Sequence, residues 1–498
     1  MQAKNQNIFS DFLRNNKSYP VLSGLAAGLY PVLFYYSRNF NMVNSWEHVG
    51  YFISVYLLFP ILLFVIAHRL ARLPVFAKYE KYVLPFLNIF SFLFILKAFL
   101  FVVLERKIIV GIFIVALLFA VFLHKYLKKV IVIQLILALM GTFTVGQEIY
   151  KNVAYSEAWK LQPDNIEDVV FKKKPNVYFI EPDGYVSFSE LKKGFYKAKN
   201  SLFEDFLLEN NFKSYPNFRS NYNTTLTSNS AAFTMKHHYF NYAIRTGEVQ
   251  NGRQNIISSN AVLNTFKKND YETYFLSESP YFLLNRPKMA YDHSNIEYSE
   301  IAYIHNGLGE IRPLMPPLES YLNDGVLKPK FFFIQILRPT HIEPSENYSE
   351  GAAVEREKYL ERLEESNTLM TQMIESIQEK DPEALIIIMA DHGGFVGLDF
   401  SFQTEIKTQD RDLIYSIFSS NLTIHWPNGE VPNYDSKLKT PVNVFRILFA
   451  YLSNNESYLG HLQPNESFIV LKEGAQPGIY KYIDASGNIV FEKMEPEE

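Results

Sequence analysis

Five apolar segments in the first 150 residues constrain the fold more than any other feature of the sequence. They lie at about 19–37, 49–67, 83–104, 108–123 and 130–146. A helix needs about 20 residues to cross the ~30 Å hydrocarbon core of a bilayer, and most of these segments approach that length. One signal peptide would not account for five segments, and a soluble bundle of such helices would lack the polar surface to cover itself. The pattern therefore predicts an N-terminal five-helix transmembrane bundle over residues 1–150.

Basic residues between the apolar segments predict the orientation of the bundle. Most of them lie at the N-terminus and in the loops after the second and fourth segments: Lys4, Arg14, Lys17, Arg69, Arg72, Lys78, Lys81, Lys125, Lys128 and Lys129. Because cytoplasmic loops of membrane proteins are enriched in lysine and arginine, we expect a cytoplasmic N-terminus. Five crossings would then deliver everything after Tyr150 to the outside. We therefore expect a multi-pass protein of the plasma (inner) membrane with an extracytoplasmic C-terminal part.

The charged residues divide the chain into two unlike parts. Residues 1–150 hold 14 Lys/Arg and 5 Asp/Glu, whereas the remainder holds 34 and 47, so the net charges are +9 and −13. This asymmetry indicates that the two parts lie in different surroundings. The acidic part argues against nucleic-acid binding, which normally requires a basic face. The chain has no cysteine, which excludes disulfides and thiolate metal ligands.

After a juxtamembrane linker, residues 151–174, the pattern changes to alternating strands and helices. In the linker, Tyr155 and Trp159 are suited to a helix that lies in the membrane interface. Buried strands are expected at 176–182, 271–276, 331–337 and 384–390, with helices between them and a hairpin turn at 484–488. The alternation predicts that residues 175–498 form an α/β domain whose central sheet is parallel or mixed and is flanked by helices.

The strand expected at 384–390 ends in the sequence MADHGG, which places Asp391 and His392 directly after it. A short apolar run between charged residues and glycines is typical of a strand buried on both faces. In open α/β sheets, functional sites are built at the carboxyl ends of strands. Two adjacent side chains that can bind metals, held at such an end, are plausible as half of a metal site.

Three other residues lie at positions where the second half of the site could form. Asp183 ends the first expected strand, Thr225 precedes an apolar helix at 226–235, and His341 follows the strand at 331–337. A hydroxyl at a helix N-terminus lies where free N–H groups favour an anion such as phosphate. Taken singly, an Asp-Gly pair is more often a turn, a threonine more often a helix cap, and a lone histidine more often structural. Together they suggest a metal ion held by oxygen and nitrogen ligands beside a hydroxyl that can attack phosphorus.

The order of these motifs resembles the sulfatase-like branch of the alkaline phosphatase superfamily. It is most similar to membrane-anchored members in which five helices precede an extracytoplasmic catalytic domain, namely phosphoglycerol and phosphoethanolamine transferases. NVYFIEPDGY resembles the family's first strand, SNYNTTLTS its nucleophile segment, LRPTHIEP its substrate loop, and MADHGG its metal pair. TPVNVFRILFAYL resembles a late helix of the same members.

The resemblance implies one divalent metal, zinc or manganese, bound by Asp183, Thr225, Asp391 and His392. It also implies a covalent phospho-threonine intermediate on Thr225 and a substrate-binding role for His341. The expected function is transfer of a phosphoglycerol or phosphoethanolamine head group from a membrane phospholipid to an envelope glycan or lipid. The chain lacks the C/S-x-P-x-R segment that sulfate-ester hydrolysis needs. The choice of Thr225 over its neighbours Thr224 and Thr227 follows from the T-x-x-S spacing to Ser228.

Two alternative functions remain open from the sequence. A membrane-tethered phosphodiesterase or phosphatase would use the same site with water as the acceptor. A catalytically silent member would instead serve as a component of an envelope complex. Arg411 precedes a strand-like sequence, LIYSIF, and could hold a phosphate oxygen, although an arginine at such a position is more often a surface residue.

Overall fold

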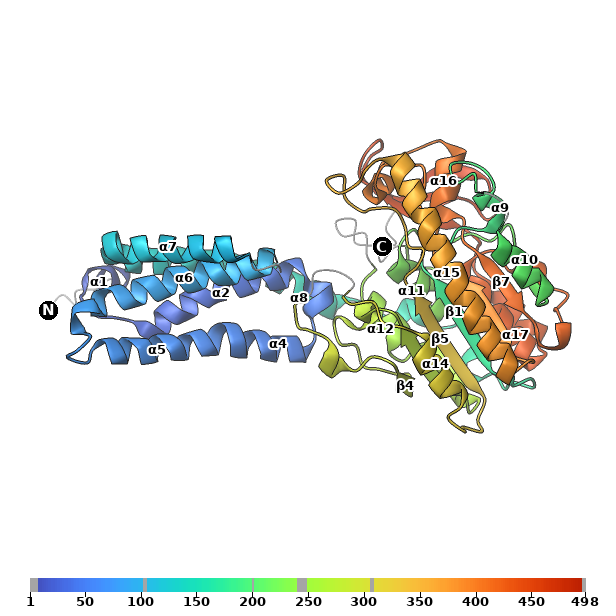
Figure 1. Cartoon of the computed structure of the whole chain (residues 1–498), viewed down its shortest axis with the longest axis horizontal. Helices are drawn as coiled ribbons and strands as arrows, with labels where there is room; N and C mark the ends of the chain where they lie inside the picture. Colours follow the sequence, from blue (N-terminus) through green and yellow to red (C-terminus); the bar gives the residue numbers. More distant parts are fainter. Residues whose placement is uncertain (1–7, 102–104, 199–200, 240–248, 305–308, 495–498) are drawn as a thin grey trace. The chain divides into compact units, whose positions relative to one another are not determined.

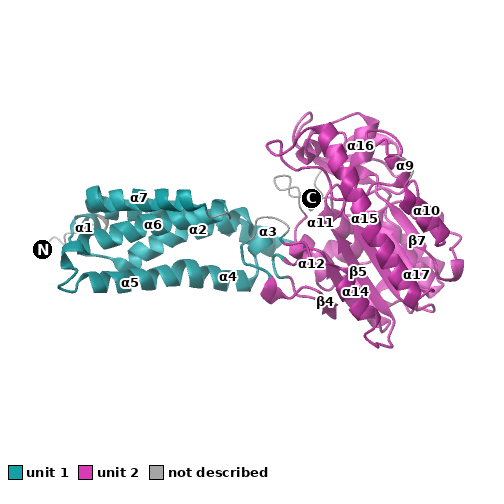
Figure 2. Ribbon diagram, in the orientation of Figure 1, with its two compact units in different colours: residues 1–155, 284–286, 301–309 teal, residues 156–283, 287–300, 310–498 magenta. Residues whose placement is uncertain are grey.

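The computed structural model describes residues 8–101, 105–198, 201–239, 249–304 and 309–494, which form two compact units (Figures 1 and 2). Unit 1 consists of Met1–Tyr155 with two short later segments, Leu284–Arg286 and Ile301–Gly309. Unit 2 consists of Ser156–Leu283, Pro287–Glu300 and Glu310–Glu498.

Each of the five apolar segments expected from the sequence contains a helix of unit 1, and residues 102–104 of the third segment lie outside the described residues. Its helices are α1 Ile8–Arg14, α2 Pro20–Arg38, α3 Phe40–Val43, α4 Trp46–Ile53, the π-helical turn η1 Ser54–Leu58, α5 Phe59–Ala71, α6 Glu80–Leu100, α7 Arg106–Phe122 and α8 Leu127–Ala154, with 3-10 turns Ala77–Tyr79 and His124–Tyr126. Three helical stretches are long and apolar enough to cross a membrane: Trp46–Ala71, Ala77–Leu100 and His124–Lys160. The 17 residues of α7 make it short for a span. The number of crossings therefore remains a prediction.

Small and polar residues hold the bundle of unit 1 together. A Cβ on Gly28 of α2 would lie 2.0 Å from the carbonyl oxygen of Tyr56, so only glycine permits this close approach of two helices. Asn88 of α6 and Gln134 of α8 exchange two side-chain hydrogen bonds of 2.9 and 3.0 Å. Asn88 also donates to the carbonyl of Ser23. These bonds satisfy buried amides that would otherwise be costly in an apolar interior.

Unit 2 is an α/β domain built on a mixed seven-stranded sheet in the order β2-β7-β6-β1-β5-β3-β4 (Figure 1). The strands are β1 Val177–Pro182, β2 Phe212–Ser214, β3 Glu272–Ser277, β4 His293–Ser294, β5 Lys330–Ile336, β6 Leu385–Met389 and β7 Leu422–His425. β6, β1, β5, β3 and β4 are parallel, whereas β7 pairs antiparallel with β6 and with β2. A smaller antiparallel sheet contains β8 Ser467–Leu471, β9 Gly478–Ile483 and β10 Ile489–Met494. The predicted mixed sheet and the C-terminal hairpin are confirmed.

Helices cover both faces of the large sheet. They are α9 Phe188–Leu191, α10 Leu202–Glu209, α11 Thr225–Thr234, α12 Gly252–Ile257, α13 Ala261–Lys268, α14 Met315–Leu322, α15 Ala352–Lys380, α16 Arg411–Phe418 and α17 Pro441–Ser453. On one face, the ring of Phe179 of β1 contacts Phe233 of α11 and Phe445 of α17. Tyr178, its neighbour in the strand, belongs instead to the buried cluster that includes Tyr359 of α15. Alternate residues of β1 thus face opposite helical layers.

The register of the central strands brings their carboxyl ends together. Ile180 of β1 pairs with Ile334 of β5 on one side and Ile388 of β6 on the other. Asp183, which follows β1, donates its N–H to the carbonyl of Ile336 at 2.9 Å. The loops after β1, β5 and β6 therefore start side by side at one edge of the sheet.

Two local expectations from the sequence are wrong. LIYSIF is not a strand but part of helix α16, because Asp410 caps this helix by accepting from the N–H groups of Asp412 and Leu413. Trp159 does not lie in an interfacial helix but in a single 3-10 turn, Ala158–Lys160. Its ring lies 5.6 Å from that of His238 of the same unit.

Candidate metal centre and nucleophile

Three side chains that can bind a metal meet at the carboxyl edge of the large sheet. Asp183 follows β1, and Asp391 and His392 follow β6, the neighbouring strand. All three are buried, and their ligand atoms lie within 4.8 Å of one another. His392 Nε2 lies 3.3 Å from Asp391 Oδ2 and 3.5 Å from Asp183 Oδ1. Residues more than 200 positions apart thus form one cluster because β1 and β6 are adjacent.

Thr225 adds a hydroxyl to this cluster. It is the first residue of α11, and its Oγ1 lies 3.4 Å from Asp183 Oδ1 and 3.5 Å from His392 Nε2. The hydroxyls of Thr224 and Thr227 instead form a 2.6 Å hydrogen bond with each other, and Thr227 also donates to the carbonyl of Thr224. Of these three threonines, Thr225 is therefore the one whose hydroxyl contacts the cluster.

The tautomer of His392 leaves its Nε2 available as a ligand. Nδ1 lies 2.8 Å from the carbonyl oxygen of Gly393, which can only accept a hydrogen bond, so Nδ1 carries the proton. Nε2 faces Asp183, Asp391 and Thr225, and in the neutral ring it offers its lone pair to a metal ion there. A metal-binding histidine commonly donates its other ring N–H to such a carbonyl, which fixes the ring.

Asp391 is only half satisfied by hydrogen bonds. Its Oδ1 accepts from the N–H of Gly184 at 3.0 Å and from that of His392 at 2.9 Å. Its Oδ2 is buried and has no hydrogen-bond partner within the described ranges of the chain. Because a buried carboxylate oxygen without a partner is costly, this atom favours a bound cation.

Crowding of carboxyl groups strengthens the case for a cation. Burial, followed by the charge of Asp391, raises the pKa of Asp183. The same two causes, in the same order, raise the pKa of Glu181, a fully buried residue of β1. Both carboxylate oxygens of Glu181 are buried, and neither accepts a hydrogen bond of normal geometry from the described residues. Three acids in an apolar interior repel one another unless protons or a metal ion neutralise them.

The distances within the cluster fit a tetrahedral metal ion. With metal–ligand bonds of about 2.0–2.1 Å, neighbouring ligand atoms in a tetrahedron lie about 3.3–3.4 Å apart. Of the six separations among the ligand atoms of Asp183, Thr225, Asp391 and His392, the four that involve His392 Nε2 or Asp183 Oδ1 with a near neighbour are 3.3, 3.4, 3.5 and 3.5 Å. The donor atoms are three oxygens and one nitrogen, a set that suits zinc and equally manganese.

His341 lies beside this cluster but outside it. Its ring centroid is 5.9 Å from that of His392, and both rings stack on Phe395. Nδ1 donates to the carbonyl of Ile342 at 2.6 Å, which leaves Nε2 as an acceptor. Burial, and next the neighbouring His392, lower the pKa of His341 to about 4, so the ring is neutral near pH 7.

Two further residues, Tyr359 and Glu181, contribute to the site. Tyr359 of α15 donates its hydroxyl to the carbonyl of Gly184 at 2.9 Å and accepts from the N–H of Val186 at 3.2 Å, which holds the loop after β1. It lies in α15, a helix rich in charged residues, where a single buried tyrosine gives no local signal of a role at the site. Glu181 is a buried carboxylate inside the apolar strand β1, and an acid in such a strand is itself a signal of a nearby site.

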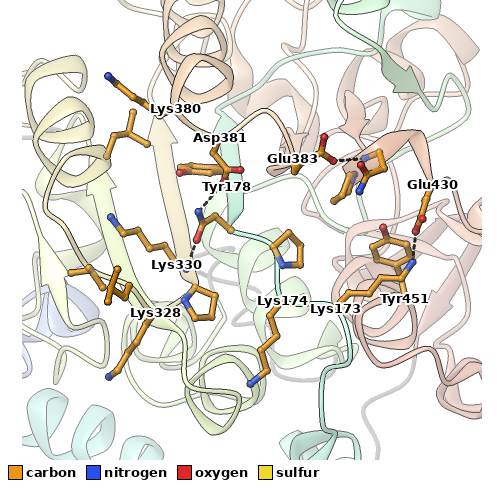
Figure 3. A pocket seen from close by; sticks show the side chains of 18 residues that line it. Lys173, Lys174, Tyr178, Lys328, Lys330, Lys380, Asp381, Glu383, Glu430 and Tyr451 are labelled. Atoms are coloured by element: carbon orange, nitrogen blue, oxygen red, sulfur yellow. Dashed lines mark hydrogen bonds and ion pairs between the residues drawn. The ribbon is translucent and has the colours of Figure 1, made fainter.

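The cavity in Figure 3 lies elsewhere, at the amino-terminal ends of β1 and β5. Its volume is about 800 Å³, and its lining includes Asn176, Tyr178 and Lys330 but none of the candidate site residues. Since the chemistry-bearing side chains lie at the opposite edge of the sheet, cavity size does not mark the site in this protein.

Comparisons with known proteins place the chain beside a family model and several solved structures. A family model described as Sulfatase matches residues 205–453. No curated protein matches the chain. Among solved structures, it is similar to the C-terminal periplasmic domain of EcEptC from Escherichia coli, with 13% identity over 63% of this chain and 96% of that chain and a TM-score of 0.41. The lipoteichoic acid synthase LtaP from Listeria monocytogenes has 13% identity over 66% and 91%, with a TM-score of 0.41. Lipooligosaccharide phosphoethanolamine transferase A (EptA) from Neisseria meningitidis has 12% identity over 89% and 97%, with a TM-score of 0.41.

Proposed function

This chain belongs to the Sulfatase family, whose model spans half of its length, and we propose that it transfers a phospho-head group between envelope molecules. The donor would be a membrane phospholipid that carries phosphoglycerol or phosphoethanolamine. The acceptor would be an envelope glycan or lipid. The choice of head group follows the resemblance of the motifs around Asp183, Thr225, His341 and Asp391 to those transferases.

The observation that carries the proposal is the position of the Thr225 hydroxyl. It lies within 3.5 Å of both Asp183 and His392, at the first residue of a ten-residue helix. The N–H groups of the first turn of α11 have no partners within the helix and favour a negatively charged group. A nucleophile, a cation site and an anion-binding helix end thus coincide, as phosphoryl transfer requires.

In the first half-reaction, Thr225 Oγ1 would attack the phosphorus of the phospholipid. The bond between phosphorus and the diacylglycerol oxygen breaks, the departing alkoxide takes up the threonine proton, and the head-group phosphate remains esterified to Thr225. A divalent metal held by Asp183, Thr225, Asp391 and His392 would lower the pKa of the hydroxyl and neutralise charge on the phosphoryl oxygens.

In the second half-reaction, an acceptor hydroxyl would attack the same phosphorus. The bond between phosphorus and Thr225 Oγ1 breaks, and the threonine oxygen takes up the proton of the acceptor hydroxyl. The acceptor then leaves as a phosphodiester. The neutral ring of His341 offers Nε2 as a hydrogen-bond acceptor for an N–H or O–H of the head group or acceptor. If water takes the place of the acceptor, the same site acts as a phosphodiesterase.

The apolar helices of unit 1 support a membrane donor. Three stretches suited to crossing a bilayer are present, and a soluble hydrolase would not need them. We propose that α2 and α7 cross as well, which makes five spans and places unit 2 outside the plasma (inner) membrane.

The test uses full-chain protein in vesicles with head-group-labelled phospholipid and envelope acceptors. We expect transfer of label to the acceptor and a labelled peptide that contains residue 225. Thr225→Ala should reduce transfer by about 10³-fold or more, as loss of a nucleophile does in other enzymes. Thr225→Ser should retain part of the activity because it keeps the hydroxyl.

Three outcomes would overturn parts of the proposal. Label recovered only as free head-group phosphate would favour the hydrolase. Unchanged transfer in Thr225→Ala would exclude the phospho-threonine route. Absence of any reaction, together with an unchanged envelope in cells that carry Thr225→Ala, would favour a catalytically silent member.

A further inference from the structure

A second cavity in unit 2 is rich in cations that the proposed transfer reaction does not use. Its volume is about 380 Å³, within the ~300–1,000 Å³ typical of small-molecule pockets. Four positively charged side chains and one carboxylate line it, namely Arg219, Arg411, Lys193, Lys439 and Glu190. This local excess of positive charge lies in the part of the chain whose net charge is −13.

The single carboxylate of the cavity is already neutralised. Arg411 binds Glu190 with both terminal nitrogens, at 2.5 and 2.6 Å, and Lys193 lies 3.0 Å from the same side chain. Although burial raises the pKa of Glu190, these hydrogen bonds leave it below its usual value. The guanidinium of Arg411 is therefore engaged by a carboxylate and is not the free phosphate ligand that its sequence position suggested.

Arg219 forms no direct ion pair among the described residues, although the charges of Tyr415 and Asp484 partly offset its burial, which lowers its pKa. It is only 7% exposed, and Nη2 donates to the carbonyls of Asn465 and, at 2.8 Å, of Asp484. Nε is buried without a hydrogen-bond partner, and Nη1 has none in the chain as far as the structure describes it. Three of the five N–H donors of this guanidinium are thus unused. Because arginine stays charged in proteins, a buried guanidinium without a directly bound carboxylate is unfavourable.

Lys439 adds a second positive charge to the cavity next to Arg219. Its carbonyl accepts the N–H of Arg219 at 3.0 Å, so the two residues are joined through their backbones. Lys439 is half-buried at the cavity, and its side chain forms no ion pair within the described segments. Two cations without carboxylate partners therefore line one cavity, which is the arrangement that binds multiply charged anions.

In the larger cavity of Figure 3, by contrast, the lysines are paired with carboxylates. Each of its five lysines has a carboxylate oxygen within 4 Å: Lys173–Glu430, Lys174–Asp270, Lys328–Glu272, Lys330–Asp324 and Lys380–Glu379. In Figure 3 the bond between Lys173 and Glu430 is drawn as a dashed line. A lysine-rich lining by itself therefore does not indicate an anion site. A buried arginine that forms no ion pair does indicate one.

We propose that the smaller cavity binds a phosphate group, with Arg219 and Lys439 as its charged ligands. A guanidinium edge matches two phosphate oxygens, and a nearby ammonium suits the second charge of a phosphate dianion. The cavity adjoins the loop that carries His392, because Ser419 lines it and the Ser419 carbonyl oxygen lies 2.9 Å from the Cβ position of Gly393. The site goes beyond the proposed transfer reaction and shares no ligand with it.

The experiment measures binding of inorganic phosphate and of glycerol 3-phosphate to metal-free, full-chain protein in detergent by calorimetry. Thr225→Ala is present throughout, so turnover is absent and failure of the transferase proposal would not affect the result. We expect Arg219→Gln to weaken binding at least 10-fold. Arg312→Gln is the matched control, because it removes an arginine that pairs with Glu300 outside the cavity, and it should leave binding unchanged.

Lys439→Gln is a second test in case Arg219→Gln does not fold, because Lys439 is only half-buried. It should weaken phosphate binding several-fold. Tighter binding of glycerol 3-phosphate than of phosphate would assign the site to a phosphate on an organic scaffold, and equal binding would assign it to phosphate alone. Binding that is absent from the parent protein, or equal in the parent and both cavity variants, would overturn the proposal.

Discussion

At the scale of single residues, the candidate site is a problem of uncompensated charge. Asp183, Asp391 and Glu181 are buried beside one another, and Asp391 Oδ2 has no hydrogen-bond partner among the residues the structure describes. His392 adds a ligand nitrogen, because its Nδ1 donates to the carbonyl of Gly393 and its Nε2 faces the carboxylates. A divalent cation resolves this conflict, and so do protons, so metal binding and pH must be linked.

The stability of the metal-free protein is predicted to fall as pH rises. The pKa of Asp183 is raised from 3.8 to about 7 by burial and then by Asp391. Between these values the folded protein binds more protons than the unfolded chain, so the free energy of unfolding decreases with pH, by at most about 1.4 kcal/mol per pH unit. We expect the thermal midpoint of the metal-free protein to drop between about pH 5 and pH 7.5, and Asp183→Asn to flatten this slope.

Added zinc or manganese is predicted to stabilise the protein more at the higher pH, because the ion competes with the proton on Asp183. The measurement is the metal-induced rise of the thermal midpoint at the same two pH values. Asp391→Asn should reduce this rise at both, since it removes a ligand. A rise that is independent of pH and of Asp391 would contradict the assignment of these residues as metal ligands.

At the scale of elements, the site depends on loops that can approach one another closely at the carboxyl edge of the sheet. The loop after β6 passes against α15, where a Cβ on Gly394 would lie 2.2 Å from Cε2 of Tyr359. A Cβ on Gly393 would lie 2.1 Å from the carbonyl oxygen of Ser416 at the other side. The two glycines after Asp391-His392 therefore allow the loop to fit between α15 and α16.

Gly394→Ala is predicted to destabilise the protein by about 1–3 kcal/mol, as overpacking of a core usually does. It should also weaken metal binding, because either the loop that carries His392 or the ring of Tyr359 must move. Gly460→Ala is the matched control, since a Cβ there would meet nothing within 4 Å. Equal thermal midpoints and equal metal affinities for the two variants would show that the loop has room to relax.

At the scale of the whole molecule, the chain combines a basic, apolar unit with an acidic α/β unit. Three helical stretches, of which the third begins in unit 1 and runs on to Lys160, meet the length and hydropathy of a membrane span. α2 is long but contains small and polar residues that are buried in the bundle, and α7 is short. The number of crossings decides on which side of the membrane unit 2 lies, so it bears directly on the proposed donor and acceptor.

Single-cysteine labelling is predicted to show five crossings. The chain has no native cysteine, so Lys17→Cys, Trp46→Cys, Glu105→Cys and Lys125→Cys can be compared directly. With five spans, an impermeant maleimide applied to intact cells should label positions 46 and 105, and should label positions 17 and 125 only after lysis. Labelling of position 17 together with 46 would show that α2 does not cross, and equal labelling of 105 and 125 would show the same for α7.

The sequence by itself determined the features that depend on local pattern. Runs of apolar residues marked the helices of unit 1 and the central strands around Ile180, Ile334 and Ile388, because burial on both faces requires such runs. Because these apolar runs mark where each strand ends, they also identify the acids and histidines that follow the strands. Local pattern misjudged residues 413–418, because the cap at Asp410 and packing against the domain outweighed their strand-like composition.

Only the tertiary structure decided which of these residues meet. The adjacency of β1 and β6 brings Asp183 to His392, and the start of α11 brings Thr225 rather than Thr224 or Thr227 to both. The five apolar segments predict helices. The number of helices that cross the membrane, however, cannot be deduced from any single segment. Distances between side chains from distant parts of the chain depend on strand order and packing, which no local pattern encodes.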